Sequence, residues 1–252
     1  MSWLLSKEGK IYYRTTTDQL DKSDIILFIH GAGLDSTVWD RVFPLLKNRY
    51  GIIALDLPGH GKSEGEVKNS LTEYLPVIDQ LIEQFPNREI YLAGHSMGGA
   101  ISLLYASENC KKINGIIVLN SSYKLPVNSQ ILEILRTNFQ LGVTTSVQFS
   151  FGEFDDEFYR EMYKKILLHN GQNVLTTDLT ACNNYLFEDF GQIHKPVSVI
   201  SGSLDKMVSP KGSKKLCGKL HDCNFELIDD VGHSTMLENP KEVAKIISDF
   251  IL

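Results

Sequence analysis

Short apolar runs that alternate with helical patterns constrain the fold of this chain more than any other feature. Most of the runs are continuously apolar, as expected for strands of a parallel sheet that is covered on both faces. The strand-like runs lie at 11–14, 25–29, 52–55, 90–93, 116–119, 197–200 and 225–228. Apolar residues recur at helical spacing at about 70–85, 97–108, 209–220 and 240–251. This alternation predicts an α/β sheet with right-handed crossovers.

The alternation is interrupted once, after the run that ends at Leu119. From residue 122 to 194 the chain shows helical and loop patterns without a strong strand, and Lys195-Pro196 then leads back to the sheet. A chain of 252 residues is long enough for one large core. We therefore expect one α/β domain, made of residues 1–121 and 195–252, and we call residues 122–194 the insertion.

Composition and charge exclude several classes of function. With 42% hydrophobic and 22% charged residues, the chain has the composition of an ordinary globular protein. Its formal net charge of -6 indicates no basic surface for nucleic acid or an anionic membrane, so we expect neither as a partner. No apolar run approaches the roughly 18 residues of a membrane span, and the first apolar stretch is too short for a secretory signal.

The cysteines give the only sequence evidence on the redox compartment. They form no CxxC pair, which argues against a zinc site. We expect buried free thiols rather than disulfides, and therefore a reducing cytoplasm, for the following residues: Cys110, Cys182, Cys217 and Cys223. In that compartment we expect a monomer or a homodimer.

One serine stands between a strand-like run and a helical pattern, in the sequence GHSMG at 94–98. The motif G-x-S-x-G marks a nucleophile only where a strand precedes it, a helix follows it, and small neighbours let the two pack closely. A second match, GKSEG at 61–65, follows proline and glycine and precedes a polar stretch, which is typical of a loop. The context therefore favours Ser96 as the nucleophile and not Ser63.

A serine nucleophile needs an imidazole as its base. His233 follows the last strand-like run, and it alone gives the chain order serine, acid, histidine. His95 adjoins the nucleophile but is expected to point away from it across the turn, and His194 stays an alternative. We expect backbone-bonded turns or solvent exposure for the remaining histidines, which are His30, His60, His169 and His221.

The imidazole in turn needs a carboxylate that fixes its tautomer. Asp205 lies in the loop after the strand-like run 197–200, at the sheet edge where parallel sheets keep their sites. Asp229 and Asp230 are so close in sequence to the histidine that solvent-exposed loop positions are expected for them. Another possible acid position holds Asn120, whose amide cannot balance an imidazolium. The sequence therefore indicates Asp205 as the acid.

An acyl-transfer site also needs two backbone N–H groups aimed at the developing oxyanion. One is expected from Met97, directly after the nucleophile. The other is expected from the glycine-rich loop after the run 25–29, which reads HGAG at 30–33. We choose the N–H of Ala32, with that of Gly33 as the alternative.

These segments together resemble the α/β-hydrolase family. They are FIHGAGLDSTVWD, ALDLPGHGKSEG, LAGHSMGGA, SGSLDKMVS and VGHSTMLENP, in the family's order. The resemblance implies a mostly parallel eight-stranded sheet flanked by helices, a helical cap formed by the insertion, and no cofactor or metal. It also explains the second serine match, because DLPGHGKS resembles a structural turn of the family. A serine at the elbow separates the chain from haloalkane dehalogenases and epoxide hydrolases, which carry an aspartate there.

The insertion is where the sequence bears on the substrate. More than half of the phenylalanines fall in it: Phe139, Phe149, Phe151, Phe154, Phe158, Phe187 and Phe190. Most of these should form the insertion's own core, while some should face an apolar pocket. Our candidates for the pocket lining are Gly31, Gly33, His95, Phe139, Phe151, Phe154 and Met207.

Charge in the insertion favours a neutral substrate. Acids outnumber bases there, and its only arginines are Arg136 and Arg160, so polyanions such as coenzyme A thioesters fit poorly. We expect a small-molecule substrate, a neutral carboxylic ester with a small or medium acyl chain. Relatives with the same triad suggest as alternatives a carbon–carbon hydrolase, an enol-lactonase, a thioesterase, a menaquinone-pathway lyase, or a receptor with little or no turnover.

Overall fold

The computed structural model describes residues 2–16 and 24–252, and its strands form one eight-stranded sheet in the order β1-β2-β4-β3-β5-β6-β7-β8. The strands from β4 to β8 in this order run parallel, while β1 and β2 are antiparallel to their neighbours. The bounds are β1 Ser2–Ser6, β2 Gly9–Thr15, β3 Ile25–Ile29, β4 Gly51–Leu55, β5 Ile90–His95, β6 Gly115–Leu119, β7 Val197–Gly202 and β8 Cys223–Ile228. The α/β fold class and the eight-stranded, mostly parallel sheet are confirmed.

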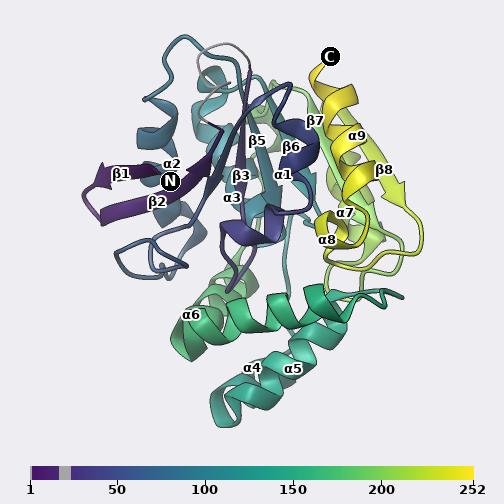
Figure 1. Ribbon diagram of the computed structural model, residues 1–252. Helices are drawn as coiled ribbons and strands as arrows, with labels where there is room; N and C mark the ends of the chain where they lie inside the picture. Colours follow the sequence, from purple (N-terminus) through teal and green to yellow (C-terminus); the bar gives the residue numbers. More distant parts are fainter. Residues whose placement is uncertain (1, 17–23) are drawn as a thin grey trace.

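Helices cover both faces of this sheet (Figure 1). They are α1 Phe43–Leu46, α2 Leu75–Ile82, α3 Met97–Asn109, α4 Ser129–Thr137, α5 Phe139–Ser150, α6 Glu157–Asn184, α7 Pro210–Cys217, α8 Thr235–Glu238 and α9 Pro240–Ile251. Short 3-10 turns lie at Ser36–Trp39, Leu71–Tyr74, Cys110–Lys112 and Phe190–Gln192.

The side chains of the central strands supply the core on both faces. Along β3, Leu27 packs with the cluster that includes α2 and α3, while its neighbour Phe28 packs with the cluster that includes α9. Every residue of β3 is buried, as are those of β4, β5, β6 and β7. Burial on both faces explains why these strands read as continuous apolar runs.

The insertion forms α4, α5 and α6 between β6 and β7. These helices lie together beyond the end of the sheet where the parallel strands terminate (Figure 1). An isolated antiparallel bridge joins Lys124 to Leu186, near the two ends of the insertion. Helix α6 is interrupted at Gly171, whose φ of 87° and ψ of 172° are not helical. The division into core and insertion stays a prediction about domains.

The structure corrects the expectation of free thiols for one pair of cysteines. Cys217, at the end of α7, forms a disulfide with Cys223, at the start of β8, with the Cα atoms 5.4 Å apart. The two cysteines are six positions apart in sequence, and the turn between helix and strand brings them together. The CxxC pattern does not cover a pair with this spacing. Cys110 and Cys182 are free. The cysteines therefore no longer argue for a reducing compartment, and the cytoplasmic location stays a prediction.

Within residues 2–16 and 24–252, no helix is both long enough and apolar enough to cross a bilayer.

Candidate active site

Ser96 occupies the tight turn between β5 and α3. Its φ of 52° and ψ of -112° lie in a region that non-glycine residues rarely adopt, so the backbone there is strained. A Cβ atom on Gly94 would lie 2.1 Å from the carbonyl oxygen of Gly98. One on Gly98 would lie 2.2 Å from the carbonyl oxygen of Ile29. The glycines around Ser96 thus let strand and helix approach closely enough to hold the serine in this conformation.

The other serine in a G-x-S-x-G match has a structural environment. Ser63 Oγ donates a hydrogen bond to the backbone oxygen of Asp56 at 2.6 Å and accepts one from the N–H of Tyr12 at 2.9 Å. The first contact closes the turn after β4, and the second ties this turn to β2. Ser63 therefore stabilises a turn, as its loop context indicates.

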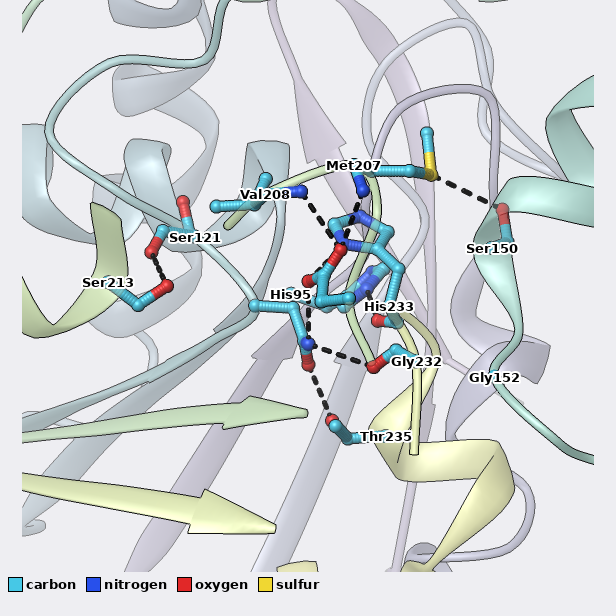
Figure 2. Close-up of polar contacts among 12 residues, drawn as sticks. His95, Ser121, Ser150, Gly152, Met207, Val208, Ser213, Gly232, His233 and Thr235 are labelled. Carbon is cyan, nitrogen blue, oxygen red and sulfur yellow. Dashed lines mark hydrogen bonds and ion pairs between the residues drawn. The ribbon is translucent and has the colours of Figure 1, made fainter. Parts of the chain in front are cut away.

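His233 and Asp205 meet at the edge of the sheet, in the loops after β8 and β7. His233 Nδ1 donates to Asp205 Oδ2 at 2.8 Å, and both side chains are buried. Asp205 Oδ1 accepts the backbone N–H groups of Met207 and Val208 at 2.8 and 2.9 Å (Figure 2). Burial alone raises the pKa of Asp205, but His233 and these hydrogen bonds outweigh burial and hold it below the usual value. The carboxylate is thus ionised at neutral pH and fixes the orientation of the ring.

Asn120 is a further part of this arrangement that the sequence did not reveal. It lies directly after β6, with φ of 48°, and its Nδ2 donates to Asp205 Oδ2 at 2.9 Å and to the Gly232 oxygen at 3.2 Å. Its Oδ1 accepts a hydrogen bond from Thr235 Oγ1 at 2.6 Å. The sequence showed only that an amide replaces a possible acid, whereas the structure shows that this amide supports the carboxylate. The signal available in the sequence was a polar residue directly after a strand-like run.

His95 also contacts the loop that carries His233. Its Nε2 donates to the backbone oxygen of His233 at 2.9 Å, and the two ring centroids are 4.8 Å apart. Burial and the neighbouring His233 lower the pKa of His95 to about 3, so this ring is neutral near pH 7. The contact thus ties the ring of His95 to the backbone of the loop that carries His233.

The remaining histidines make other contacts or lie on the surface. His30 Nδ1 bonds the backbone oxygen of Gly31 at 2.9 Å, and the ring of His60 lies against His30. The side chains of three further histidines are exposed: His169, His194 and His221. The alternative base His194 therefore has no place in the buried arrangement described above.

A cavity of about 270 Å³ lies between the core and the insertion. The core contributes Ala32, Leu34, His95, Ser96, Lys206, Met207, Val208 and His233. The insertion contributes Leu125, Pro126, Val127, Asn128, Ile131, Ser146, Phe149, Ser150, Tyr163, Leu167, Leu175, Leu179 and Cys182. Ser96 and His233 thus open onto the same, largely apolar space.

The cavity uses other aromatic residues than those expected. Phe149 borders it, whereas Phe139, Phe151 and Phe154 are not part of its lining. Phe151 stacks on Phe154, with centroids 5.7 Å apart, and packs edge-on against Tyr163 behind the cavity wall. Phe149 lies at the end of α5, whereas Phe151 and Phe154 lie in the loop between α5 and α6, and the composition of the segment does not show how this loop packs.

Of the other residues predicted to line the cavity, two do so and the two glycines do not. Met207 and His95 line the cavity, and the Met207 sulfur accepts a hydrogen bond from Ser150 of the insertion at 3.5 Å (Figure 2). Gly31 packs beside the ring of His95, with space for no Cβ atom. Gly33 donates its N–H to Asp178 at 2.8 Å, so this N–H is not directed at the cavity.

Neither arginine of the insertion lines the cavity. Arg160 donates to the backbone oxygens of Phe154 and Gly152 at 2.8 and 3.3 Å, and Arg136 is not among the residues that line the cavity. Lys206 is the one lysine or arginine among the lining residues, and its side chain is exposed. The cavity wall is therefore largely apolar, and its polar members in the insertion, such as Ser146 and Ser150, are uncharged.

Comparisons with known proteins show which sequences this chain resembles. A family model described as the alpha/beta hydrolase family matches residues 26–246. Monoacylglycerol lipase abhd6-A from Xenopus laevis is 23% identical over 265 residues, which cover 90% of this chain and 74% of that protein.

Solved structures resemble the whole fold. An esterase from Exiguobacterium antarcticum superposes with a TM-score of 0.91 at 15% identity, covering 99% of this chain and 98% of the other. The enol-lactonase from Burkholderia xenovorans superposes with a TM-score of 0.90 at 17% identity, covering 99% of each chain. At these identities the superpositions show a common fold.

Proposed function

This chain belongs to the α/β-hydrolase family, and we propose that it cleaves small or medium neutral carboxylic esters through an acyl-enzyme on Ser96. The chain is a hydrolase of the carboxylesterase-like kind, whose relatives include a monoacylglycerol lipase and esterases of the same fold. One observation carries the proposal: Ser96 and His233, whose ring is paired with Asp205, line the same largely apolar cavity.

In the proposed reaction, Ser96 Oγ attacks the ester carbonyl while His233 takes its proton. Because Nδ1 is bonded to Asp205, the neutral ring has its free lone pair on Nε2, the nitrogen that accepts the proton. The carbonyl oxygen becomes an oxyanion, which the N–H groups of Ala32 and Met97 stabilise. The ester C–O bond then breaks, and His233 returns the proton to the leaving alcohol.

The second half of the reaction repeats these roles with water. His233 accepts a proton from the water as its oxygen attacks the acyl-enzyme, and the proton then passes to Ser96 Oγ as the acid leaves. Asp205 stays ionised throughout and stabilises the imidazolium. We propose that the insertion acts as the cap, because its apolar side chains close the cavity over Ser96.

The size and wall of the cavity support the substrate class. Its volume of about 270 Å³ lies just below the range of about 300–1,000 Å³ that is typical of small-molecule sites, so a small or medium acyl group fits best. Leu167, Leu175 and Leu179 of α6 would contact such a chain. Neither Arg136 nor Arg160 lines the cavity, which favours a neutral group over a carboxylate.

A second candidate substrate is favoured by Lys206. This ammonium lies at the edge of the cavity and is placed to attract a substrate that carries a carboxylate, as in an enol-lactone or a dienone acid.

Turnover decides between enzyme and receptor: p-nitrophenyl butyrate should be hydrolysed repeatedly by the wild type and not by Ser96→Ala. A single burst of p-nitrophenol without further turnover would favour a receptor.

A further inference from the structure

Asp178 is a fully buried carboxylate that the proposed reaction does not use. It belongs to the part of α6 after Gly171, yet its hydrogen bonds go to the core. Its Oδ2 accepts the backbone N–H of Gly33 at 2.8 Å and faces His60 Nε2 at 2.7 Å. Its Oδ1 accepts the hydroxyl of Tyr74 at 3.2 Å. One side chain of the insertion thus binds three separate segments of the core.

His60 supplies the charge that a buried carboxylate requires. Its Nδ1 lies 3.1 Å from the backbone oxygen of Pro58, which can only accept, and its Nε2 faces the carboxylate, so both nitrogens donate. Burial disfavours the charged ring, but Asp178 outweighs burial and raises the pKa of His60. Asp56 acts in the same direction. Buried pairs of this kind persist where the charges are matched and hydrogen-bonded.

The other titratable groups around His60 do not replace this pairing. The ring of His30 lies 4.9 Å away, and its Nε2 accepts the N–H of Leu57 at 3.0 Å. Burial and the charge of His60 hold the pKa of His30 well below its usual value, so His30 is neutral. Tyr74, whose ring lies 6.3 Å away, has a raised pKa because it is buried beside Asp178, and it stays protonated.

Asn170 holds the same stretch of backbone from the other side of the break in α6. Its Nδ2 donates to the backbone oxygens of Gly33 and Leu34 at 2.9 and 3.0 Å, and its Oδ1 accepts the N–H of Gly61 at 2.8 Å. Gly33 has φ of 68°, and a Cβ on it would lie 2.7 Å from Leu175. The insertion therefore binds both the N–H and the C=O of Gly33 at close contact.

The position of Gly33 gives these contacts a catalytic consequence. Its N–H belongs to the peptide that follows Ala32, the residue whose own N–H we assign to the oxyanion hole. Fixing that peptide plane restricts rotation about the backbone of Ala32, and oxyanion donors act through such preorganisation. We propose that Asp178, paired with His60, is a positioning residue that holds Ala32 in the oxyanion hole and couples this hole to the insertion. This inference rests on the proposed function.

The catalytic test compares Asp178→Ala and Asp178→Asn with the wild type on p-nitrophenyl butyrate, with rates expressed per active site titrated by a fluorophosphonate. Since the oxyanion forms only in the transition state, we expect Asp178→Ala to lower kcat about ten- to a hundredfold with KM changed less than about threefold. Asp178→Asn keeps an oxygen for the Gly33 N–H and should recover part of the loss. Thr180→Ala is the matched control on the same helix, because Thr180 Oγ1 bonds only the Thr176 oxygen of its own helix.

The outcomes separate this inference from the proposed function. If Asp178→Ala merely misfolds, the titrated fraction falls while kcat per labelled site stays at the wild-type value, and that result overturns the positioning role. If the wild type is not labelled at Ser96, the proposed function fails instead. Hydrogen exchange then tests the contact without catalysis: the Gly33 amide should exchange slowly in the wild type and Thr180→Ala, and faster in Asp178→Ala. Equal exchange in all three would overturn the inference.

Discussion

His95 Nε2 donates a hydrogen bond to the backbone oxygen of His233, at 2.9 Å, across 138 positions of sequence. The residue next to the proposed nucleophile therefore holds the loop that carries the proposed base. The buried His95 ring is neutral, with its pKa lowered to about 3, so the contact persists across the pH range in which such enzymes work.

Replacing His95 tests this contact. His95→Phe removes the donor while keeping an aromatic ring, and we expect kcat to fall about tenfold or more, because small displacements of catalytic groups are costly. His95→Gln retains an N–H donor and should lose less. The measurement is kcat per labelled site for both variants. A His95→Phe enzyme with the wild-type kcat would contradict a positioning role for this ring.

Asp205→Asn tests the orientation of the proposed base. The amide keeps the shape of the side chain but cannot stabilise an imidazolium, so we expect kcat to fall by about three to four orders of magnitude with the fold retained. In the wild type, kcat/KM should rise with pH, because only the neutral imidazole accepts the serine proton. The circular dichroism spectrum of the variant controls for folding. A harmless substitution or a flat pH profile would count against the triad.

The same carboxylate makes stability depend on acid. Because the pKa of Asp205 is lower in the folded state than the unfolded value of about 3.9, its contribution is fully present above about pH 4. It is lost as the pH falls through the folded pKa. We therefore expect the Tm difference between wild type and Asp205→Asn to shrink on acidification from pH 7 to pH 3. A difference that stays constant or widens would show that the ionised form is not favoured by folding.

Particular residues show how far the sequence could predict this fold. The strand 25–29 is predicted residue for residue, because full burial on both faces leaves an uninterrupted apolar run. In β1 only Leu4 is buried, and its neighbours Trp3 and Leu5 are exposed, so this edge strand has no such signal. Local pattern thus predicts the buried central strands and misses β1.

The candidate site divides along a similar line. Ser96, Asp205 and His233 each stand in a local motif at a strand's carboxyl end, and the fold brings those ends together. The pairing of His60 with Asp178 spans 118 positions and joins a turn to a helix of the insertion, so no local pattern indicates it. The cavity lining depends in the same way on how the insertion packs, and Phe149 lines the cavity where Phe151 does not.

The acyl-chain preference tests the cavity. In a series of p-nitrophenyl esters, each added methylene should lower KM by at most a few-fold, about 0.8 kcal/mol, until the cavity is full. Longer chains should then give no further gain. A neutral ester should be preferred to an ω-carboxylate ester of matched length, because the insertion carries more acids than bases. Added salt screens this repulsion and should reduce the difference in kcat/KM between the two esters.

Lys206 provides the control for that comparison. Preference for the carboxylate ester, abolished in Lys206→Met, would contradict the neutral-ester proposal. It would favour the lactone or carbon–carbon hydrolase in its place. An unchanged neutral preference in Lys206→Met would show that the lysine at the cavity's edge does not select the substrate.

The most direct test of the central claim is the site of covalent labelling. A fluorophosphonate should modify the wild type at one residue, identified by peptide mass spectrometry as Ser96. Ser96→Ala should abolish labelling. It should also reduce turnover to the weak rate that the oxyanion hole and substrate binding supply. Ser63→Ala is the matched control from the second motif and should be labelled like the wild type. Labelling at Ser63, or turnover by Ser96→Ala at the wild-type rate, would contradict the account.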